Sequence, residues 1–193
     1  MAAVGVFTVV AGTGLAADRY EIEPGSARAS IFVKWLGVWF RLAEFTGVQG
    51  ELVLDPEDPE ASAIAARVAV ASIDTGQSWR DRLITGPKWL DAATYPDIVF
   101  HSSAVDALNA AVAEVSGEIQ LKGVSGPVTL TSELLDADPD AGRAAFTASG
   151  EMRRSVFGLN GWRPMVADRV RFEIEARAVR AEPARADATL SAD

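Results

Sequence analysis

The chain has 193 residues, 49% of them hydrophobic, which is enough for one domain with a sizeable core. Its formal net charge is −9 and its basic residues do not cluster along the sequence, which argues against nucleic-acid binding and against electrostatic docking on anionic lipid surfaces. The sequence contains no cysteine, which excludes disulfides, thiol nucleophiles and zinc–thiolate sites.

The N-terminal segment, residues 1–17, is apolar, rich in small residues and free of charge, and Asp18 opens polar sequence. An apolar core that ends in small residues is typical of a secretory signal peptide. No Lys or Arg precedes that core, so an uncleaved anchor or an additional buried strand stays open as the alternative. We expect a periplasmic or secreted protein without stable membrane insertion after processing.

Nine segments that follow have the composition of β-strands, and turn-like residues separate them. The clearest is 169–179, where apolar and charged residues alternate, as expected for a strand with one buried and one wet face. No helical period of ten residues recurs between strands, which argues against a parallel βαβ sheet. The predicted strands are 19–23, 27–40, 42–54, 63–72, 97–105, 110–121, 127–135, 143–152 and 169–179.

This pattern predicts an all-β antiparallel fold, either a closed barrel or a sandwich. An eight-stranded barrel is wide enough to hold one small ligand, but pattern alone does not separate a hollow barrel from a filled one. After the last strand, residues 181–193 are Ala-rich, polar and aperiodic, which predicts a disordered tail.

Residues 72–100 interrupt the strand pattern and are the first place to look for a ligand. A structureless connection of this length is uncommon in a compact domain and often forms a lid or a binding loop. It carries the charged cluster 80–82 and two large apolar residues, Trp79 and Trp89. We therefore predict a short helical or irregular lid around residues 76–93.

Four short motifs occur in order along the chain. They are Phe45, Gly50 and Leu-Val-Leu-Asp at 52–55; Ser-Ile-Asp-Thr at 72–75 with Arg80-Asp81 and the stretch 95–103; Gly-Glu-Ile-Gln-Leu-Lys-Gly-Val-Ser-Gly-Pro-Val at 117–128; and Arg-Ser-Val-Phe-Gly at 154–158. In residue type and spacing they resemble the motifs of the YceI-like proteins, also called polyisoprenoid-binding proteins. The resemblance runs from about residue 18 to residue 179.

This resemblance implies an eight-stranded lipocalin-like barrel over residues 18–180, with an elongated apolar tunnel that binds an isoprenoid lipid of the quinone or polyprenyl phosphate type. The chain departs from the family pattern at positions that often carry polar groups. Leu83 and Trp35 stand where the family often has histidine, and Val156 stands where it has aspartate. A further departure is Ala43 in place of a glycine. The lost polar groups bear on how a lipid head group is held, and they leave the barrel unaffected.

An apolar chain ligand needs wide, rigid side chains and few polar groups around it. Any single tryptophan, taken alone, is more often a core residue than a ligand contact. The lid and the loop 157–165 are better candidates than the strands, because loops usually stay polar unless they cover something. The predicted ligand-binding residues are Phe32, Trp35, Trp39, Phe45, Arg80, Asp81, Leu83, Trp89, Leu90, Phe100, Phe157 and Trp162.

Arg80 and Asp81 allow two interpretations. Arginine can grip a phosphate or a quinone head through its bidentate fork. Alternatively the pair is a structural clasp, at a helix start or as a loop salt bridge, which is the interpretation that the weak average contribution of such pairs favours.

Catalytic and metal-binding motifs are absent from the sequence. His101, the single histidine, follows the inward-facing Ile98 and Phe100 in alternation and should face solvent, and no nucleophile elbow accompanies it. The residues from Asp136 to Asp140 resemble the start of an EF-hand, but the later loop positions do not fit, which favours a solvated hairpin turn.

We therefore predict a carrier or sequestering protein that is not an enzyme, with no cofactor or metal and an apolar lipid as its partner. An enzyme acting on a lipid-like substrate, or a structural domain with a filled core, is the alternative. Whether the protein forms a homodimer is left open.

Overall fold

The computed structural model of the protein describes residues 18–55, 59–138, 140–162 and 164–181. The predicted signal peptide, and the predicted tail beyond residue 181, lie outside the described residues. None of the helices in the described part of the chain is long and apolar enough to span a bilayer.

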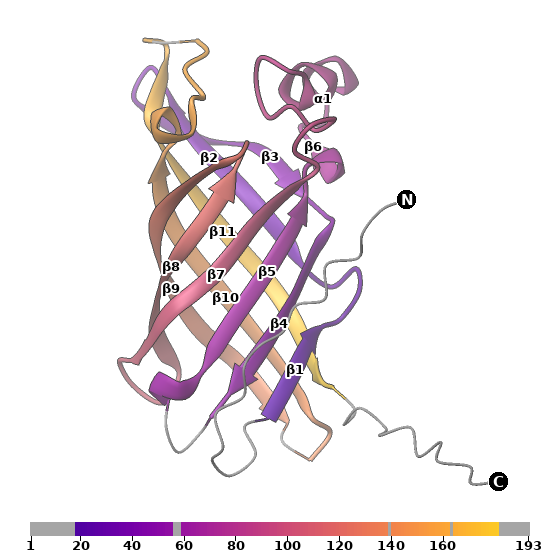
Figure 1. Ribbon diagram of the computed structural model, residues 1–193, viewed down its shortest axis with the longest axis vertical. Coiled ribbons are helices and arrows are strands. Elements are labelled where there is room, and N and C mark those ends of the chain that lie inside the picture. Colours follow the sequence, from indigo (N-terminus) through magenta and orange to yellow (C-terminus); the bar gives the residue numbers. More distant parts are fainter. Residues whose placement is uncertain (1–17, 56–58, 139, 163, 182–193) are drawn as a thin grey trace, which may run out of the picture.

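The described residues form one antiparallel sheet that curls into a barrel (Figure 1). The strands are β1 (Asp18–Ile22), β2 (Arg28–Trp35), β3 (Val38–Phe45), β4 (Val48–Leu54), β5 (Ala63–Ala69), β6 (Ile73–Asp74), β7 (Asp97–Ala107), β8 (Val112–Leu121), β9 (Val124–Asp138), β10 (Arg143–Arg153) and β11 (Val166–Arg180). One α-helix, α1 (Ser78–Thr85), and three short 3-10 turns, η1 (Pro59–Ala61), η2 (Val70–Ser72) and η3 (Arg154–Phe157), complete the fold.

Eight strands close the ring in the order β1-β4-β5-β7-β8-β9-β10-β11, because β1 pairs with both β4 and β11. Strands β2, β3 and β6 extend the sheet from the other end of β11, where β2 pairs with residues 166–175. The closed antiparallel eight-stranded barrel confirms the lipocalin-like fold predicted from the sequence. Closure gives the two end strands of the ring, β1 and β11, a partner at the seam, whereas β3 has a second partner only at Glu44 and Phe45, which pair with β6.

Alternation along β11 places its apolar side chains inside the barrel, as the sequence predicts. Val170, Phe172, Ala176 and Ala178 are buried, while the arginines between them are exposed. On the outer surface the charges pair: Arg169 bridges to Glu151 of β10 at 3.1 Å. Because both side chains are exposed, this pair contributes little to stability.

The predicted strand 27–40 is two strands, β2 and β3, joined by the turn Leu36-Gly37. Both turn residues have positive φ, 48° and 89°, as in the type I′ turns that suit two-residue hairpins. The prediction of one strand is wrong because Asn, Asp and Gly usually mark such a turn, whereas leucine gives no turn signal.

A β-bulge in β3 changes which of its residues face the interior. Ile31 pairs with Ala43, whereas the next residue, Phe32, pairs with Arg41, so that Leu42 is the extra residue. As a result Leu42 and Ala43, although adjacent, both line the barrel interior. The bulge shifts the alternation halfway along the strand.

The predicted lid is present as α1 and the turns that follow it, above one end of the barrel (Figure 1). The helix begins after Gln77 and ends at Gly86, whose amide N donates to the Leu83 carbonyl at 3.3 Å. Below it the interior contains three clusters of buried apolar residues, and all three share the flanking residues Ile31 and Met152. We call the end that carries the lid the mouth.

Candidate functional site

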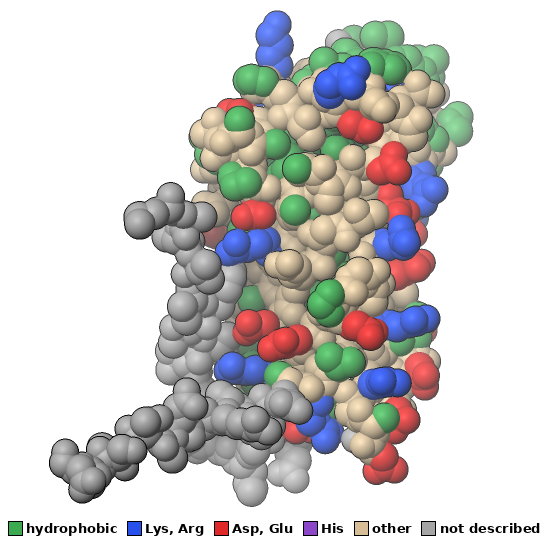
Figure 2. Space-filling model, turned by 90° about the vertical axis from the view of Figure 1, so that its right-hand side faces the viewer, with side chains coloured by type: hydrophobic (Ala, Val, Ile, Leu, Met, Phe, Trp, Pro, Cys, Tyr) green, Lys and Arg blue, Asp and Glu red, His purple; other side chains and the backbone are tan. Residues whose placement is uncertain are grey.

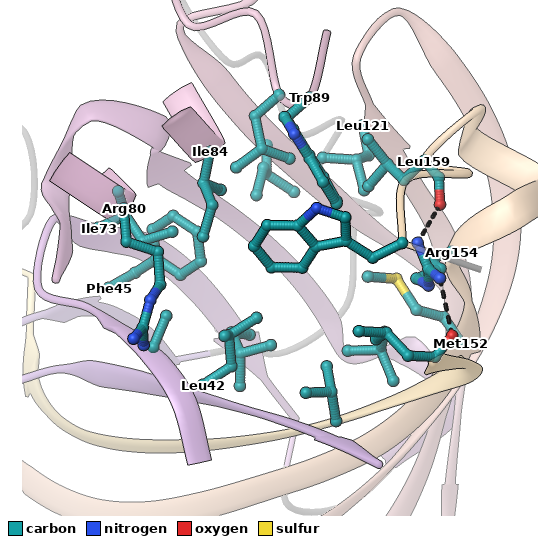
Figure 3. Close-up of a pocket in the computed structure, with 18 of the residues that line it drawn as sticks. Leu42, Phe45, Ile73, Arg80, Ile84, Trp89, Leu121, Met152, Arg154 and Leu159 are labelled. Carbon is teal, nitrogen blue, oxygen red and sulfur yellow. Dashed lines mark hydrogen bonds between the residues drawn. The ribbon is translucent and has the colours of Figure 1, made fainter. Parts of the chain in front are cut away.

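A cavity of about 360 Å³ lies inside the barrel at the mouth, directly under the lid (Figure 3). The strands supply aliphatic side chains, and the lid and the loop after η3 supply aromatic ones. Only two of its lining residues, Arg80 and Arg154, carry a charge. The main residues that line this upper cavity are Val33, Trp35, Phe40, Leu42, Phe45, Ile73, Trp79, Arg80, Ile84, Trp89, Leu90, Leu121, Met152, Arg154, Leu159, Trp162 and Val170.

A second cavity of about 140 Å³ lies deeper in the barrel. Ser132 is the one residue of its lining with a polar side chain, and Phe100, Phe146 and Phe172 are among the others. The two cavities share part of their walls, so they follow one another along the interior. The shared residues are Ile31, Phe45, Ile98, Leu121 and Met152.

Two tryptophans from distant parts of the sequence meet over the upper cavity. The rings of Trp89 from the lid and Trp162 from the late loop are 5.4 Å apart at an interplanar angle of 69°, an edge-to-face pair. The Trp89 ring lies so close to Gly161 that a Cβ there would overlap it. Trp162 has a φ of 58°, a conformation that non-glycine residues rarely adopt. The backbone of the late loop is thus shaped around the tryptophan pair.

Arg154 holds that late loop in place. The side chain is 4% exposed, and its guanidinium donates hydrogen bonds to four backbone carbonyls. Nη1 reaches Leu159 O at 2.6 Å and Gly161 O at 2.7 Å, Nη2 reaches Val166 O at 2.9 Å, and Nε reaches Ala167 O at 3.0 Å. The planar fork can serve all four, so the buried polar groups are satisfied.

Sequence reasoning assigned no role to Arg154, although it begins one of the four motifs. Its partners are backbone carbonyls, and these leave no trace in the pattern of side chains. The next residue adds a second tie, because the backbone N and the hydroxyl of Ser155 donate to Asp168 at 3.0 and 2.8 Å.

Asp81 and Arg80 have separate environments. Asp81 Oδ1 accepts hydrogen bonds from Thr75 Oγ1 at 2.6 Å and from Thr75 N at 2.9 Å, which ties α1 to the segment before it. The pKa of Asp81 is lowered below its usual value, mainly by the hydrogen bond from the Thr75 side chain and next by the one from the Thr75 backbone. The positive charges of Arg80 and Arg82 lower it further. Asp81 therefore has the structural role, a clasp that joins α1 to Thr75, and its partner is not Arg80.

Arg80 lies on the opposite side of the upper cavity from Arg154, with Ile84 and Trp89 between them (Figure 3). Its guanidinium carbon lies 5.5 Å from the centre of the Trp79 ring, a cation–π contact. Among the described residues no carboxylate or carbonyl oxygen accepts a hydrogen bond from this guanidinium. Its donors are available to an anionic or carbonyl group at the mouth.

Seven of the twelve residues predicted from sequence line a cavity. Six line the upper cavity and Phe100 lines the lower one, while Phe45 belongs to both. The six in the upper cavity are Trp35, Phe45, Arg80, Trp89, Leu90 and Trp162.

The other five predicted residues line neither cavity. Phe32 and Trp39 point outward, since their strand neighbours point inward, and Lys34 Nζ lies 4.9 Å from the Trp39 ring centre on that outer face. Leu83 is exposed on α1 and Asp81 is engaged with Thr75, while Phe157 is a core residue that packs against Gly126.

His101 is exposed, as its strand position predicts. Asp136 and Asp138 are exposed at the end of β9. The described residues contain no group of three or more His, Cys, Asp or Glu side chains that could hold a metal ion.

The fold and the cavities define a lipocalin-like β-barrel with an internal apolar site. The YceI-like domain model matches residues 20–178, and the chain belongs to this family. The UPF0312 protein of Pseudomonas putida (strain W619) is 33% identical over 166 residues, which cover 82% of this chain and 85% of the relative. The UPF0312 protein of Yersinia pestis (strain Pestoides F) is 32% identical over 161 residues, with 81% and 83% covered.

Solved structures share the fold at lower identity. BcnA of Burkholderia cenocepacia superposes with a TM-score of 0.74 at 23% identity, over 82% of this chain and 99% of that one. A polyisoprenoid binding domain from Saccharophagus degradans gives a TM-score of 0.65 at 14% identity, over 84% and 98% of the two chains.

Proposed function

We propose that this protein binds one elongated apolar lipid of the isoprenoid type inside the barrel, and carries or sequesters it without covalent chemistry. The observation that carries the proposal is the pair of adjoining apolar cavities, which share five lining residues and follow one another into the barrel. An extended chain would occupy both, with its polar end at the mouth.

The driving force is removal of the apolar chain from water. Burial contributes about 25 cal/mol per Å² of apolar surface, so a long chain has ample area to offset the entropy lost when it is ordered. The upper cavity alone falls within the roughly 300–1,000 Å³ of small-molecule sites. The likeness in fold to a domain described as polyisoprenoid-binding supports an isoprenoid over other apolar chains.

Arg80 is the residue that we propose for the head group. It lines the mouth, and no described acceptor takes its side-chain hydrogen bonds, whereas the guanidinium of Arg154 already donates to four carbonyls. A phosphate or a quinone carbonyl could accept from the Arg80 fork.

The alternatives fit the cavities less well. An enzyme that acts on a lipid-like substrate would need a titratable acid or base at its reacting centre, but the ionisable side chains of both linings are Arg80 and Arg154. A structural domain with a filled core would have no need for two cavities of this size.

Extraction of the natively purified protein with organic solvent, followed by mass spectrometry, tests the proposal. We expect one prenyl lipid per chain. The absence of any co-purified lipid, together with failure to bind added prenyl lipids, would contradict it.

The head-group assignment needs two ligands of equal chain length, a prenyl phosphate and an uncharged prenyl alcohol. Arg80→Lys should weaken binding of the phosphate about tenfold, because lysine lacks the bidentate fork, and leave the alcohol unchanged. Arg82→Lys, on the same helix but exposed and outside the cavity, is the matched control. Equal weakening of both ligands would instead mean that Arg80 supports the lid.

A further inference from the structure

The exposed apolar side chains of the described residues gather at the mouth. Thirteen large hydrophobic residues are exposed, and only Leu108, Leu134 and Leu135 belong to the opposite end. Figure 2 shows hydrophobic side chains crowded at the end that carries α1. The other ten, which we call the mouth rim, are Trp35, Leu36, Val38, Phe40, Trp79, Leu83, Val124, Val156, Trp162 and Met165.

Hydrogen bonds join the segments that supply the mouth rim. Leu36 N in the β2–β3 turn donates to Met165 O in the late loop at 3.4 Å, and Lys122 Nζ in the β8–β9 turn donates to Pro87 O in the lid at 3.3 Å. Four of the rim residues also line the upper cavity, so apolar surface continues from the outside into the barrel. These four are Trp35, Phe40, Trp79 and Trp162.

The tip of the β2–β3 hairpin displays leucine where the backbone disfavours it. Leu36 has a φ of 48° and is 78% exposed, and Val38 beside it is 69% exposed. Asparagine or glycine at position 36 would fit the turn better and avoid the exposed apolar surface. A residue kept at an exposed turn although its backbone conformation is strained there indicates that its side chain has a function.

Charge also differs between the ends. Apart from the buried Arg154, the described residues of segments 34–39, 74–97, 121–124 and 153–168 contain six Lys or Arg against five Asp, although the whole chain carries −9. Four of these aspartates bond internally: Asp74 accepts from Gly76, Asp81 from Thr75 and Asp168 from Ser155, and Asp97 pairs with Arg67. Basic residues that are scattered in sequence therefore share one end, while acidic residues crowd the turn between β9 and β10 at the other. The net charge of the whole chain, which argues against docking on anionic lipid surfaces, therefore does not represent the charge at the mouth.

We infer that the mouth rim docks on the surface of a lipid bilayer with anionic head groups, where the barrel takes up or releases its lipid. The apolar tip residues enter the interfacial region, and the basic residues around them face the head groups. The prenyl chain then passes between bilayer and cavity without crossing water, which would be costly. The inference that the mouth rim binds a bilayer, rather than another partner, rests on the proposed function.

Co-sedimentation with vesicles tests the inference. The wild-type protein should bind vesicles of phosphatidylglycerol and phosphatidylcholine more tightly than pure phosphatidylcholine, and less tightly as salt rises. The double variant Leu36→Asn/Val38→Thr should bind at least about tenfold more weakly, because it removes apolar surface from the rim. It should fold at least as well, since Asn-Gly is a favoured type I′ turn.

The matched control is Leu108→Asn/Leu135→Thr at the opposite end, where the side chains are 62% and 60% exposed, and it should bind vesicles like the wild type. Binding of a detergent-dispersed prenyl alcohol, measured on the same variants, separates the two proposals, because positions 36 and 38 lie outside both cavities. Rim-dependent vesicle binding without prenyl binding would keep the docking surface and refute the proposed function.

Three outcomes overturn the inference: no binding of anionic vesicles by the wild-type protein, equal binding by the rim variant, or equal loss in the control. Self-association that only the rim variant abolishes, without vesicle binding, would assign the surface to a second copy of the chain.

Discussion

Arg154 shapes the mouth from inside the protein. Its four hydrogen bonds go to carbonyls at positions 159, 161, 166 and 167, on both sides of Trp162. The tryptophan is held in a rarely adopted conformation, and such conformations persist only where the surroundings fix them. The buried guanidinium of Arg154, by binding these backbone carbonyls, thus holds Trp162 where it can contact Trp89.

Arg154→Lys should lower the free energy of unfolding by about 2–3 kcal/mol, because one ammonium group cannot serve four carbonyls, and buried acceptors left without donors cost about 1–3 kcal/mol. Arg153→Lys, one residue earlier and exposed, should change it by less than about 0.5 kcal/mol. Urea denaturation measures both. Equal effects of the two substitutions would refute the structural role of Arg154.

At the scale of single elements, α1 is fastened by Asp81. The carboxylate lies in the first turn, where the helix dipole favours negative charge, and accepts both hydrogen bonds of Thr75. Because the pKa of Asp81 is lowered in the folded protein, the clasp is fully present above the unfolded value of 3.8 and is lost as the pH falls through the lower folded value.

We predict that the amide signal of Thr75 in NMR spectra shifts with a midpoint below pH 3.8 in the wild-type protein, and that this titration disappears in Asp81→Ala. That variant should also expose the lid to chymotrypsin, because α1 loses its tie to residue 75. Arg82→Ala, an exposed change on the same helix, should leave the titration in place. A midpoint at or above 3.8 would show that the clasp does not favour the charged carboxylate.

Some elements could be predicted from the sequence and others could not. The regular alternation in β11 predicts its buried face, and the break in pattern after residue 72 predicts the lid. The β2–β3 region was misread because the turn at Leu36 has no turn residue and the bulge at Leu42 shifts the alternation. An unbroken strand 27–40 would put Trp39 on the same face as Trp35, whereas the turn puts it on the outer face. Phe32 lies one residue before the inward-facing Val33, so neither the turn nor the bulge accounts for its misplacement. A bulge depends on the pairing of two strands, which local composition does not reveal.

At the scale of the whole molecule, the two cavities meet at the five residues that line both. Met152 lines both, and it comes from β10, whose pairing with β9 and β11 fixes its place. Shortening this side chain should widen the interior where the two cavities meet.

We expect Met152→Ala to move the preferred chain length in a series of prenyl alcohols towards longer members, at a cost of about 2 kcal/mol in stability for the lost packing. Met165→Ala is the control, since Met165 is 46% exposed and lines neither cavity. Titration of both variants with the series gives the answer. An unchanged length preference would mean that the two cavities do not accept one continuous chain.

Closure of the ring has a consequence for how the protein is made. Strand β1 pairs with β11, and Arg180 bonds to Asp18 across a sequence separation of 162 residues. The barrel cannot close until the last strand has left the ribosome, and contacts of such long range are slow to form. Until then β10 and β1 each lack a neighbour on one side, and unpaired edges of this kind are where nascent chains associate with one another or with a chaperone.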